Sequence, residues 1–278
     1  MSKILYPTPL HKQAAEQVVE FFANTNGIDA VLLVNSRARG KATPDSCLDM
    51  IVLVSESFRD PGFAGAVLER EENKGTDSLY QAWDHNAETQ AVRSALATAG
   101  RFSEIHLDLT DGTITATSLN RDQGLDGFEI AIGNYYVYSQ PLWLGSDRFY
   151  ELQAGWLPYY DEQLRARRLS ATREYCHYFL DHIEPYIERG LYFQAFDRLY
   201  YAFQGFLQGL FISRRRYPIA YNKWIREQVE EILKLPDLYR QLPSILEIKA
   251  LESQDLVNKG NHLRELITKY LIEQESTI

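Results

Sequence analysis

The sequence predicts an α+β protein, with a mixed sheet and flanking helices first and an all-helical bundle after it. Two observations support this class. Continuous apolar runs of strand length lie in the first half, and helical periodicity dominates the second half. The length of 278 residues suits two domains of ordinary size. We therefore place a sheet domain at residues 1–145 and a helical domain at residues 146–278.

In the first half, the hydrophobic pattern alternates between helix and strand spacing. Apolar residues at helical spacing predict helices, and apolar runs or strict alternation predict strands. A Thr-Asp-Gly turn at 110–112 predicts a hairpin whose return strand is 113–119. The expected elements are helices at 11–27 and 76–99, and strands at 29–36, 48–54, 102–109, 113–119 and 127–139.

The second half carries a long apolar stripe at steps of three and four residues. It runs from Tyr192 through Phe196, Leu199 and Phe203 to Leu210, which predicts one helix with this face in the core. A second amphipathic helix is expected at 256–274. The stripe also suits the wall of an acceptor pocket, but core packing is the favoured interpretation.

Composition and charge narrow the class of protein. Hydrophobic residues make up 45% of the chain, which excludes disorder as its main state. The net charge is -9, so we expect no general binding to nucleic acid and none to an anionic membrane. Two cysteines form no disulfide framework, and no signal peptide or membrane-length apolar run occurs, so we expect a cytoplasmic protein. The sequence leaves homodimerisation open.

The chemistry is concentrated in residues 31–54, VLLVNSRARGKATPDSCLDMIVLV. This segment predicts a strand, a tight turn that starts a short helix, a polar loop and a second strand. Such a turn can place backbone N–H groups and the Ser36 hydroxyl around phosphate oxygens. Asp49 begins the second strand, so its carboxylate should project near that turn, where a divalent cation would bridge it to a nucleotide.

On these residues the segment resembles the signature of the polymerase-beta-type nucleotidyltransferase superfamily, particularly its small bacterial antibiotic-modifying (aminoglycoside) members. That signature is Gly-Ser after a strand, about ten further residues, then Asp-hydrophobic-Asp on the next strand. A third acidic residue lies on a later strand. Only about 20 residues carry the motif, although the order of sheet followed by helices also agrees.

The resemblance implies roles for individual residues. Ser36 matches the signature serine, Arg39 belongs to the common sequel, and Asp49 matches the second acidic residue. Asp108 is the candidate third carboxylate, and Glu104 is a candidate general base for an acceptor hydroxyl. Asp49 and Asp108 would then be the metal ligands. The face that carries Glu104 and Asp108 is alternatively a solvated sheet face, and Asp49 is alternatively a surface carboxylate at a strand start.

Two positions depart from the signature. Asn35 stands at the glycine position and is a mild change, because asparagine tolerates positive φ better than most residues. Cys47 stands at the first metal-binding aspartate. A thiol is soft and mostly protonated near neutral pH, whereas Mg²⁺ prefers hard oxygen ligands. Cys47 is either a small apolar filler or part of a soft-metal site with Asp49 and His106.

The function implied is transfer of a nucleotidyl group, AMP from ATP, to a hydroxyl of an unknown small molecule, with Mg²⁺ or Mn²⁺ as cofactor. Cys47 would impair this activity. The alternative is a catalytically inactive nucleotide-binding or protein-interaction regulator on the same fold. In the second half, Lys223 is a candidate contact for the triphosphate, because a compact ammonium neutralises phosphate charge.

Overall fold

The protein is described by a computed structural model that covers residues 4–55, 74–116 and 125–272. The chain divides into two compact units. The first unit comprises Met1–Thr115 and Ala131–Leu157, and the second comprises Ala116–Ile130 and Pro158–Ile278. The first unit contains a mixed four-stranded sheet with helices, and the described part of the second unit is helical. The predicted α+β class is confirmed.

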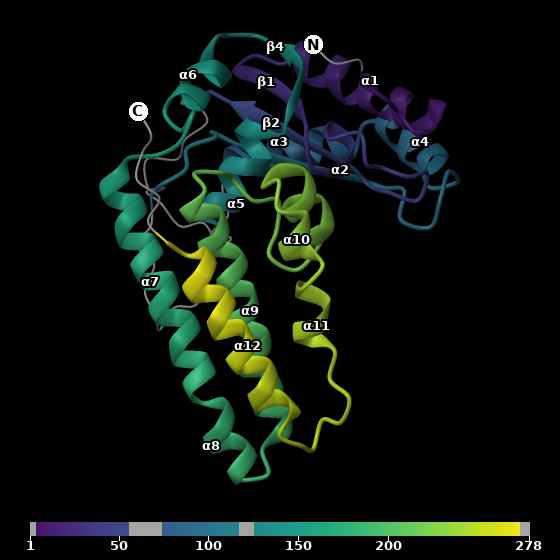
Figure 1. Ribbon diagram of the computed structural model, residues 1–278. Coiled ribbons are helices and arrows are strands. Elements are labelled where there is room, and N and C mark those ends of the chain that lie inside the picture. The colour runs from purple at the N-terminus through teal and green to yellow at the C-terminus, as the bar shows by residue number, and fades with distance from the viewer. Residues whose placement is uncertain (1–3, 56–73, 117–124, 273–278) are drawn as a thin grey trace. The chain divides into compact units, whose positions relative to one another are not determined.

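The sheet of the first unit has the strand order β3-β2-β1-β4. Its strands β2, β1 and β4 are labelled in Figure 1. Its central strand pair is antiparallel, β4 is antiparallel to β1, and β3 is parallel to β2. The strands are β1 Ile28–Leu33, β2 Leu48–Val54, β3 Ile105–Thr110 and β4 Gln140–Leu144. The helices of this unit are α1 Pro9–Ala23, α2 Asn35–Ala38, α3 Lys74–Asp84, α4 Ala87–Leu96, η2 Gly133–Val137, which is a π-helix, and α6 Arg148–Ala154.

The core of the first unit fixes which face of the sheet each side chain occupies. Val18 and Phe22 of α1 pack with Trp83 of α3 against Leu48 and Met50 of β2. Successive residues of a strand point to opposite faces. Position 49 therefore projects from the face opposite α1 and α3.

The second unit is built around three long helices, α7, α9 and α12, which lie side by side (Figure 1). Leu199, Phe203 and Leu210 of α9 are buried in its core, so the apolar stripe is core as predicted. The helices are α7 Glu162–Asp181, α8 Ile183–Glu188, α9 Tyr192–Ser213, the π-helix η3 Glu227–Ile232, α10 Pro236–Tyr239, α11 Leu242–Leu246 and α12 Asp255–Tyr270. Helix α5, Phe128–Ile132, lies at the junction of the two units in the sequence.

The segment 127–139 was predicted as strand and is helical, which makes that prediction wrong. Phe128, Ile132 and Tyr136 are buried at steps of four residues, the spacing of one helical face. The hairpin is also wrong where it is described, because residues 113–116 form no strand. Positions 117–119 lie outside the described residues. Strand β4 was not predicted; Pro141 is tolerated there because β4 is an edge strand.

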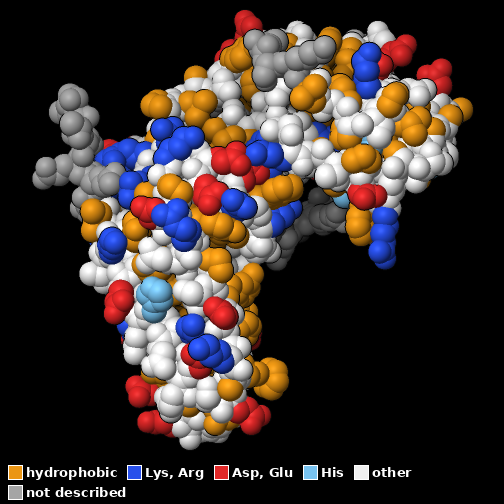
Figure 2. Space-filling view, turned by 45° about the vertical axis from the view of Figure 1, so that its right-hand side comes forward, with side chains coloured by type: hydrophobic (Ala, Val, Ile, Leu, Met, Phe, Trp, Pro, Cys, Tyr) orange, Lys and Arg blue, Asp and Glu red, His pale blue; other side chains and the backbone are white. Residues whose placement is uncertain are grey.

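Charge on the second unit is mixed. Figure 2 shows its Lys and Arg side chains interspersed with Asp and Glu on the face in view. This agrees with the near balance of basic and acidic residues after residue 145. None of the helices within the described ranges has both the length and the apolar character that a membrane span needs.

Candidate functional site

The turn after β1 has the backbone conformation that the sequence indicates. Asn35 begins α2 with a φ of 57°, in the left-handed region that asparagine adopts more readily than most side chains. Ser36 follows and is buried. The asparagine therefore provides a bend of the kind for which glycine is commonly used.

The start of β2 lies beside this turn. The Val34 N–H donates to the carbonyl oxygen of Asp49, with N and O 3.1 Å apart. The buried Arg37 of α2 donates from its guanidinium to the backbone carbonyls of Ser46 and Cys47. Burial lowers the pKa of Arg37 to about 10. The turn that contains Ser36 and the strand that begins near Asp49 thus meet at one edge of the sheet. Arg37 stabilises this arrangement, and its role was not predicted from the sequence.

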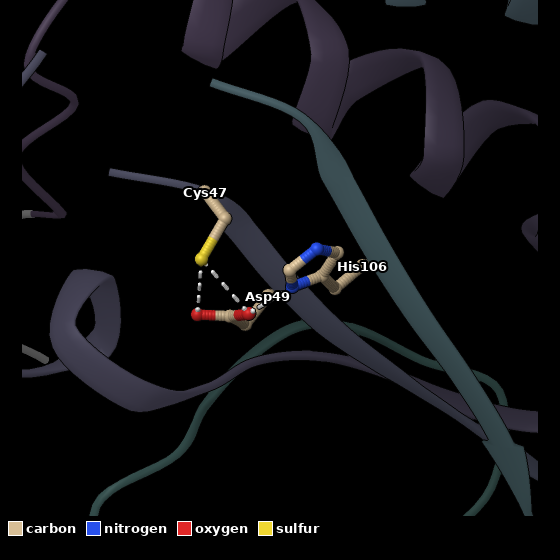
Figure 3. A group of neighbouring side chains, drawn as sticks. All are labelled: Cys47, Asp49 and His106. Carbon is tan, nitrogen blue, oxygen red and sulfur yellow. Dashed lines mark hydrogen bonds and ion pairs between the residues drawn. The ribbon is translucent and has the colours of Figure 1, made fainter. Parts of the chain in front are cut away.

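A cysteine, an aspartate and a histidine converge there (Figure 3). The Cys47 Sγ lies 3.2 Å and 3.3 Å from the two carboxylate oxygens of Asp49. The Nδ1 of His106 lies 3.1 Å from Asp49 Oδ1. His106 reaches this position because β2 and β3 are parallel and Asp49 is its register partner. One ligand atom from each of the three side chains lies within 4.8 Å of the others.

Glu104 immediately precedes β3, the strand of His106, and lies beside this group. Its Oε1 lies 2.8 Å from the other ring nitrogen, Nε2. Burial alone would lower the pKa of His106, but the hydrogen bond to Glu104 and the charge of Asp49 raise it. Burial and the negative charge of Asp49 raise the pKa of the Cys47 thiol to about 11. Without a cation, Cys47 is therefore a protonated donor to Asp49.

Asp108 lies one row further along the sheet, since its register partner is Ile51. Its Oδ2 accepts a hydrogen bond of 2.8 Å from the Tyr135 hydroxyl. The cluster contains His106 and does not include Asp108. Alternation along β3 was visible in the sequence, but which of its residues faces Asp49 depends on the register.

The other predicted residues lie in two places. Arg39 is the partly buried C-cap of α2, in the first unit with Asn35 and Ser36. Lys223 belongs to the second unit, where its side chain is exposed and its carbonyl accepts a hydrogen bond from Gln228.

The donor set does not fit Mg²⁺. This ion takes oxygen ligands in near-octahedral geometry, whereas the cluster offers a thiol, an imidazole and a single carboxylate. A thiol, an imidazole and a carboxylate are instead the donors typical of sites for zinc and related cations.

Gly100 holds the loop that leads into Cys47. A Cβ at this position would lie 2.7 Å from Asp45 Cα and 2.8 Å from the Pro44 carbonyl oxygen. The loop is tied down further by hydrogen bonds from Arg101 N to Asp45 Oδ1 and from Ser103 Oγ to Pro44 O. Because the Asp45 Cα and the Pro44 carbonyl oxygen are backbone atoms, they cannot move aside without displacing the loop.

We expect Gly100→Ala to lower the free energy of unfolding by about 1–3 kcal/mol, the usual cost of overpacking. Urea denaturation of the full chain measures it. Gly127→Ala is the matched control, because its Cβ would meet nothing within 4 Å; its change should stay within about 0.5 kcal/mol. Equal midpoints for the two variants would contradict this account of the loop.

No family model matches the sequence. No curated protein matches it either. Among solved structures, the chain is similar to a nucleotidyltransferase-like protein from Exiguobacterium sibiricum 255-15, with 14% sequence identity and a TM-score of 0.43. The alignment covers 94% of this chain and 78% of that chain. A match of this strength assigns neither a family nor an activity.

Proposed function

We propose that the first unit is a nucleotidyltransferase-like domain that binds a nucleoside triphosphate, ATP in the first instance, at the Ser36 edge of the sheet. The observation that carries the proposal is the convergence of the Asn35–Ser36 turn and Asp49 at that edge, through the Val34 N–H bond to Asp49. The order of these residues matches the signature described above. Within the first unit, the charged group proposed to face the phosphates is Arg39, which follows the turn as the C-cap of α2.

The reaction we propose is transfer of AMP to a hydroxyl of a small molecule. The acceptor must lose a proton as its oxygen attacks the α-phosphate, and pyrophosphate leaves. Glu104 is exposed to solvent and its Oε1 lies 2.8 Å from His106 Nε2, so this carboxylate is the proposed proton acceptor, held in position by the imidazole. Mg²⁺ does not fit the cluster, so no step is assigned to it.

A second candidate is a domain that binds the nucleotide without transferring it. Cys47 favours this alternative, because its protonated thiol occupies the place where the signature has a metal-binding carboxylate. Binding and transfer must therefore be measured separately.

Thermal unfolding with each of four nucleoside triphosphates, with Mg²⁺ or Mn²⁺ present, tests binding. A ligand at 100 times its Kd stabilises the folded state by about 2.7 kcal/mol, which raises Tm by several degrees. We expect Ser36→Ala to weaken ATP binding by about tenfold or more, because a hydrogen bond to a charged group contributes about 1.5–3 kcal/mol. Lys223→Ala in the same assay tests the triphosphate contact predicted for this exposed lysine.

Ser94→Ala is the control, since Ser94 lies on α4 and its hydroxyl donates to the Gln90 carbonyl. It should leave nucleotide binding unchanged. No Tm shift with any of the four nucleotides would disprove nucleotide binding. A shift without release of pyrophosphate, across a panel of hydroxyl-bearing acceptors, would favour the second candidate.

A further inference from the structure

The motif implies a magnesium site at the edge of the sheet. The side chains that meet there are instead those of a site for a softer cation. A thiol, a carboxylate and an imidazole meet from two neighbouring strands. Zinc and cations of similar softness use these three donor types, usually with tetrahedral geometry. We propose that Cys47, Asp49 and His106 bind one such divalent cation, Zn²⁺ or a close analogue, with a fourth position open to water or a substrate oxygen.

The distances suit this geometry. Zinc lies about 2.3 Å from sulfur and about 2.0–2.2 Å from nitrogen or oxygen, so tetrahedral ligand atoms lie about 3.4–3.6 Å apart. The Cys47 Sγ is 3.2 Å from Asp49 Oδ1, and His106 Nδ1 is 3.1 Å from the same oxygen. These two pairs need to separate by only a few tenths of an ångström, and the three ligand atoms all lie within 4.8 Å of one another. No change of strand register is needed, because all three residues lie in or next to the paired strands.

Glu104 strengthens the proposal from outside the ligand set. If Nδ1 of His106 binds the cation, Nε2 carries the proton and can donate to Glu104 Oε1, 2.8 Å away. Metal-binding histidines almost always have such a partner, which fixes the ring orientation and raises the basicity of the ligating nitrogen. Glu104 is thus a positioning residue for His106.

The proposed site is accessible to solvent from one side. The Asp49 side chain is only 13% exposed, whereas that of His106 is 56% exposed. The cluster is therefore anchored on one side and open on the other. Arg37 donates to the Cys47 carbonyl and so fixes the backbone at the first ligand. Three protein ligands with one open position is the arrangement of catalytic zinc sites, whereas structural sites use four.

The metal alone, without nucleotide, provides the test. After chelator treatment and dialysis, the full chain is titrated with Co²⁺ and Zn²⁺. We expect one Co²⁺ per chain, with the charge-transfer absorption of a cobalt–thiolate bond and the visible bands of tetrahedral Co²⁺. Zn²⁺ should displace it, and Mg²⁺ in large excess should not. Cys47→Ser should abolish the thiolate absorption, and His106→Gln should weaken Zn²⁺ binding by at least tenfold.

Two further variants distinguish binding at this specific site from non-specific metal binding. Glu104→Gln should weaken Zn²⁺ binding by about 10–100-fold, the usual effect of removing an outer partner, while the cobalt–thiolate absorption is retained at saturation. Cys176→Ala removes the other cysteine, which is buried in the second unit, and should change neither the absorption nor the stoichiometry. Circular dichroism checks that each variant is folded.

The proposal is overturned if Zn²⁺ binds no more tightly than Mg²⁺, or if folded Cys47→Ser retains both the affinity and the absorption. This result is independent of nucleotide binding. A protein that binds Zn²⁺ but no nucleotide would refute the proposed function alone, and one that binds nucleotide but no Zn²⁺ would refute the cation site alone.

Discussion

Replacing Arg168 with methionine is expected to lower the free energy of unfolding of the second unit by about 3–5 kcal/mol, because it leaves a buried carboxylate without its partner. The Arg168 and Glu129 side chains are both completely buried. The guanidinium donates to both oxygens of Glu129, each at 2.7 Å. It also donates to both oxygens of Asp126, at 2.9 Å and 2.6 Å. This network links α5, through Glu129, and the segment before it, through Asp126, to helix α7.

Other buried groups depend on the same carboxylate. Gln208 of α9 donates to Glu129 Oε2 at 3.0 Å, and the Tyr160 hydroxyl donates to Oε1 at 2.8 Å. Burial and the charge of Glu129 raise the pKa of Tyr160, so this hydroxyl stays a donor. The Glu129 carboxylate can accept hydrogen bonds from these partners and from Arg168 at the same time. Removing Arg168 therefore leaves the negative charge of Glu129 with neutral donors only.

Urea denaturation followed by circular dichroism measures this effect, with Arg240→Met as the control. Arg240 forms an ion pair with Asp237 in which both side chains are largely exposed, so its loss should have little effect on stability. Adding Glu129→Gln to Arg168→Met should restore part of the lost stability, since it removes the uncompensated charge. A loss for Arg168→Met no larger than the control would show that the network contributes nothing.

This network also marks a limit of what the sequence reveals. Arg168 lies in the run Arg165, Arg167 and Arg168, which has the composition of a solvated helix face. Its partner Glu129 lies 39 residues away in the sequence. Local periodicity contains no information about such a pair, because burial of a charge is decided by its partner in the folded chain. The apolar stripe of α9, in contrast, is local and was predicted.

Some strands could likewise be predicted from local sequence and others could not. Strand β2 was predicted with the bounds it has, Leu48–Val54, since a continuous apolar run suits a strand covered on both faces. Segment 127–139 was misassigned because its aromatic and β-branched residues favour strands, whereas packing of Phe128, Ile132 and Tyr136 selects a helix. Strand β4 was missed because Pro141 and Gly145 are residues that usually interrupt a strand. Proline is tolerated in an edge strand, but the sequence does not reveal that this segment forms one.

At the candidate site, the sequence predicts the turn and Asp49, and it names Asp108 as the third carboxylate, whereas the structure places His106 beside Asp49. Alternation places Glu104, His106 and Asp108 on one face of β3. Only the parallel register with β2 determines that His106 faces Asp49 and that Asp108 faces Ile51. A shift of two residues would preserve the face and exchange the partner. The ligand type at the third position is therefore a property of the register.

Because that register is known, the site can be rebuilt for magnesium. We expect the double variant Cys47→Asp, His106→Asp to bind Mg²⁺ about 100-fold or more tightly than the natural protein and to lose Zn²⁺ affinity by a similar factor. Both changes replace a soft or borderline donor with a carboxylate beside Asp49. Metal stabilisation of transition-state charge contributes several kcal/mol, and each 1.4 kcal/mol is about tenfold in rate. Release of pyrophosphate from ATP in Mg²⁺ should rise accordingly.

The matched control is Cys47→Asn, His106→Asn, which has nearly the same side-chain shapes without the added negative charges. It should gain neither Mg²⁺ affinity nor pyrophosphate release, because a neutral amide is a much weaker ligand for Mg²⁺ than a carboxylate. If the aspartate variant gains affinity without turnover, the donors are placed correctly but the geometry for transfer to an acceptor is missing. If neither variant binds Mg²⁺ more tightly than the natural protein, Cys47 does not occupy a metal-ligand position, and the equivalence of this edge of the sheet to the nucleotidyltransferase site is wrong.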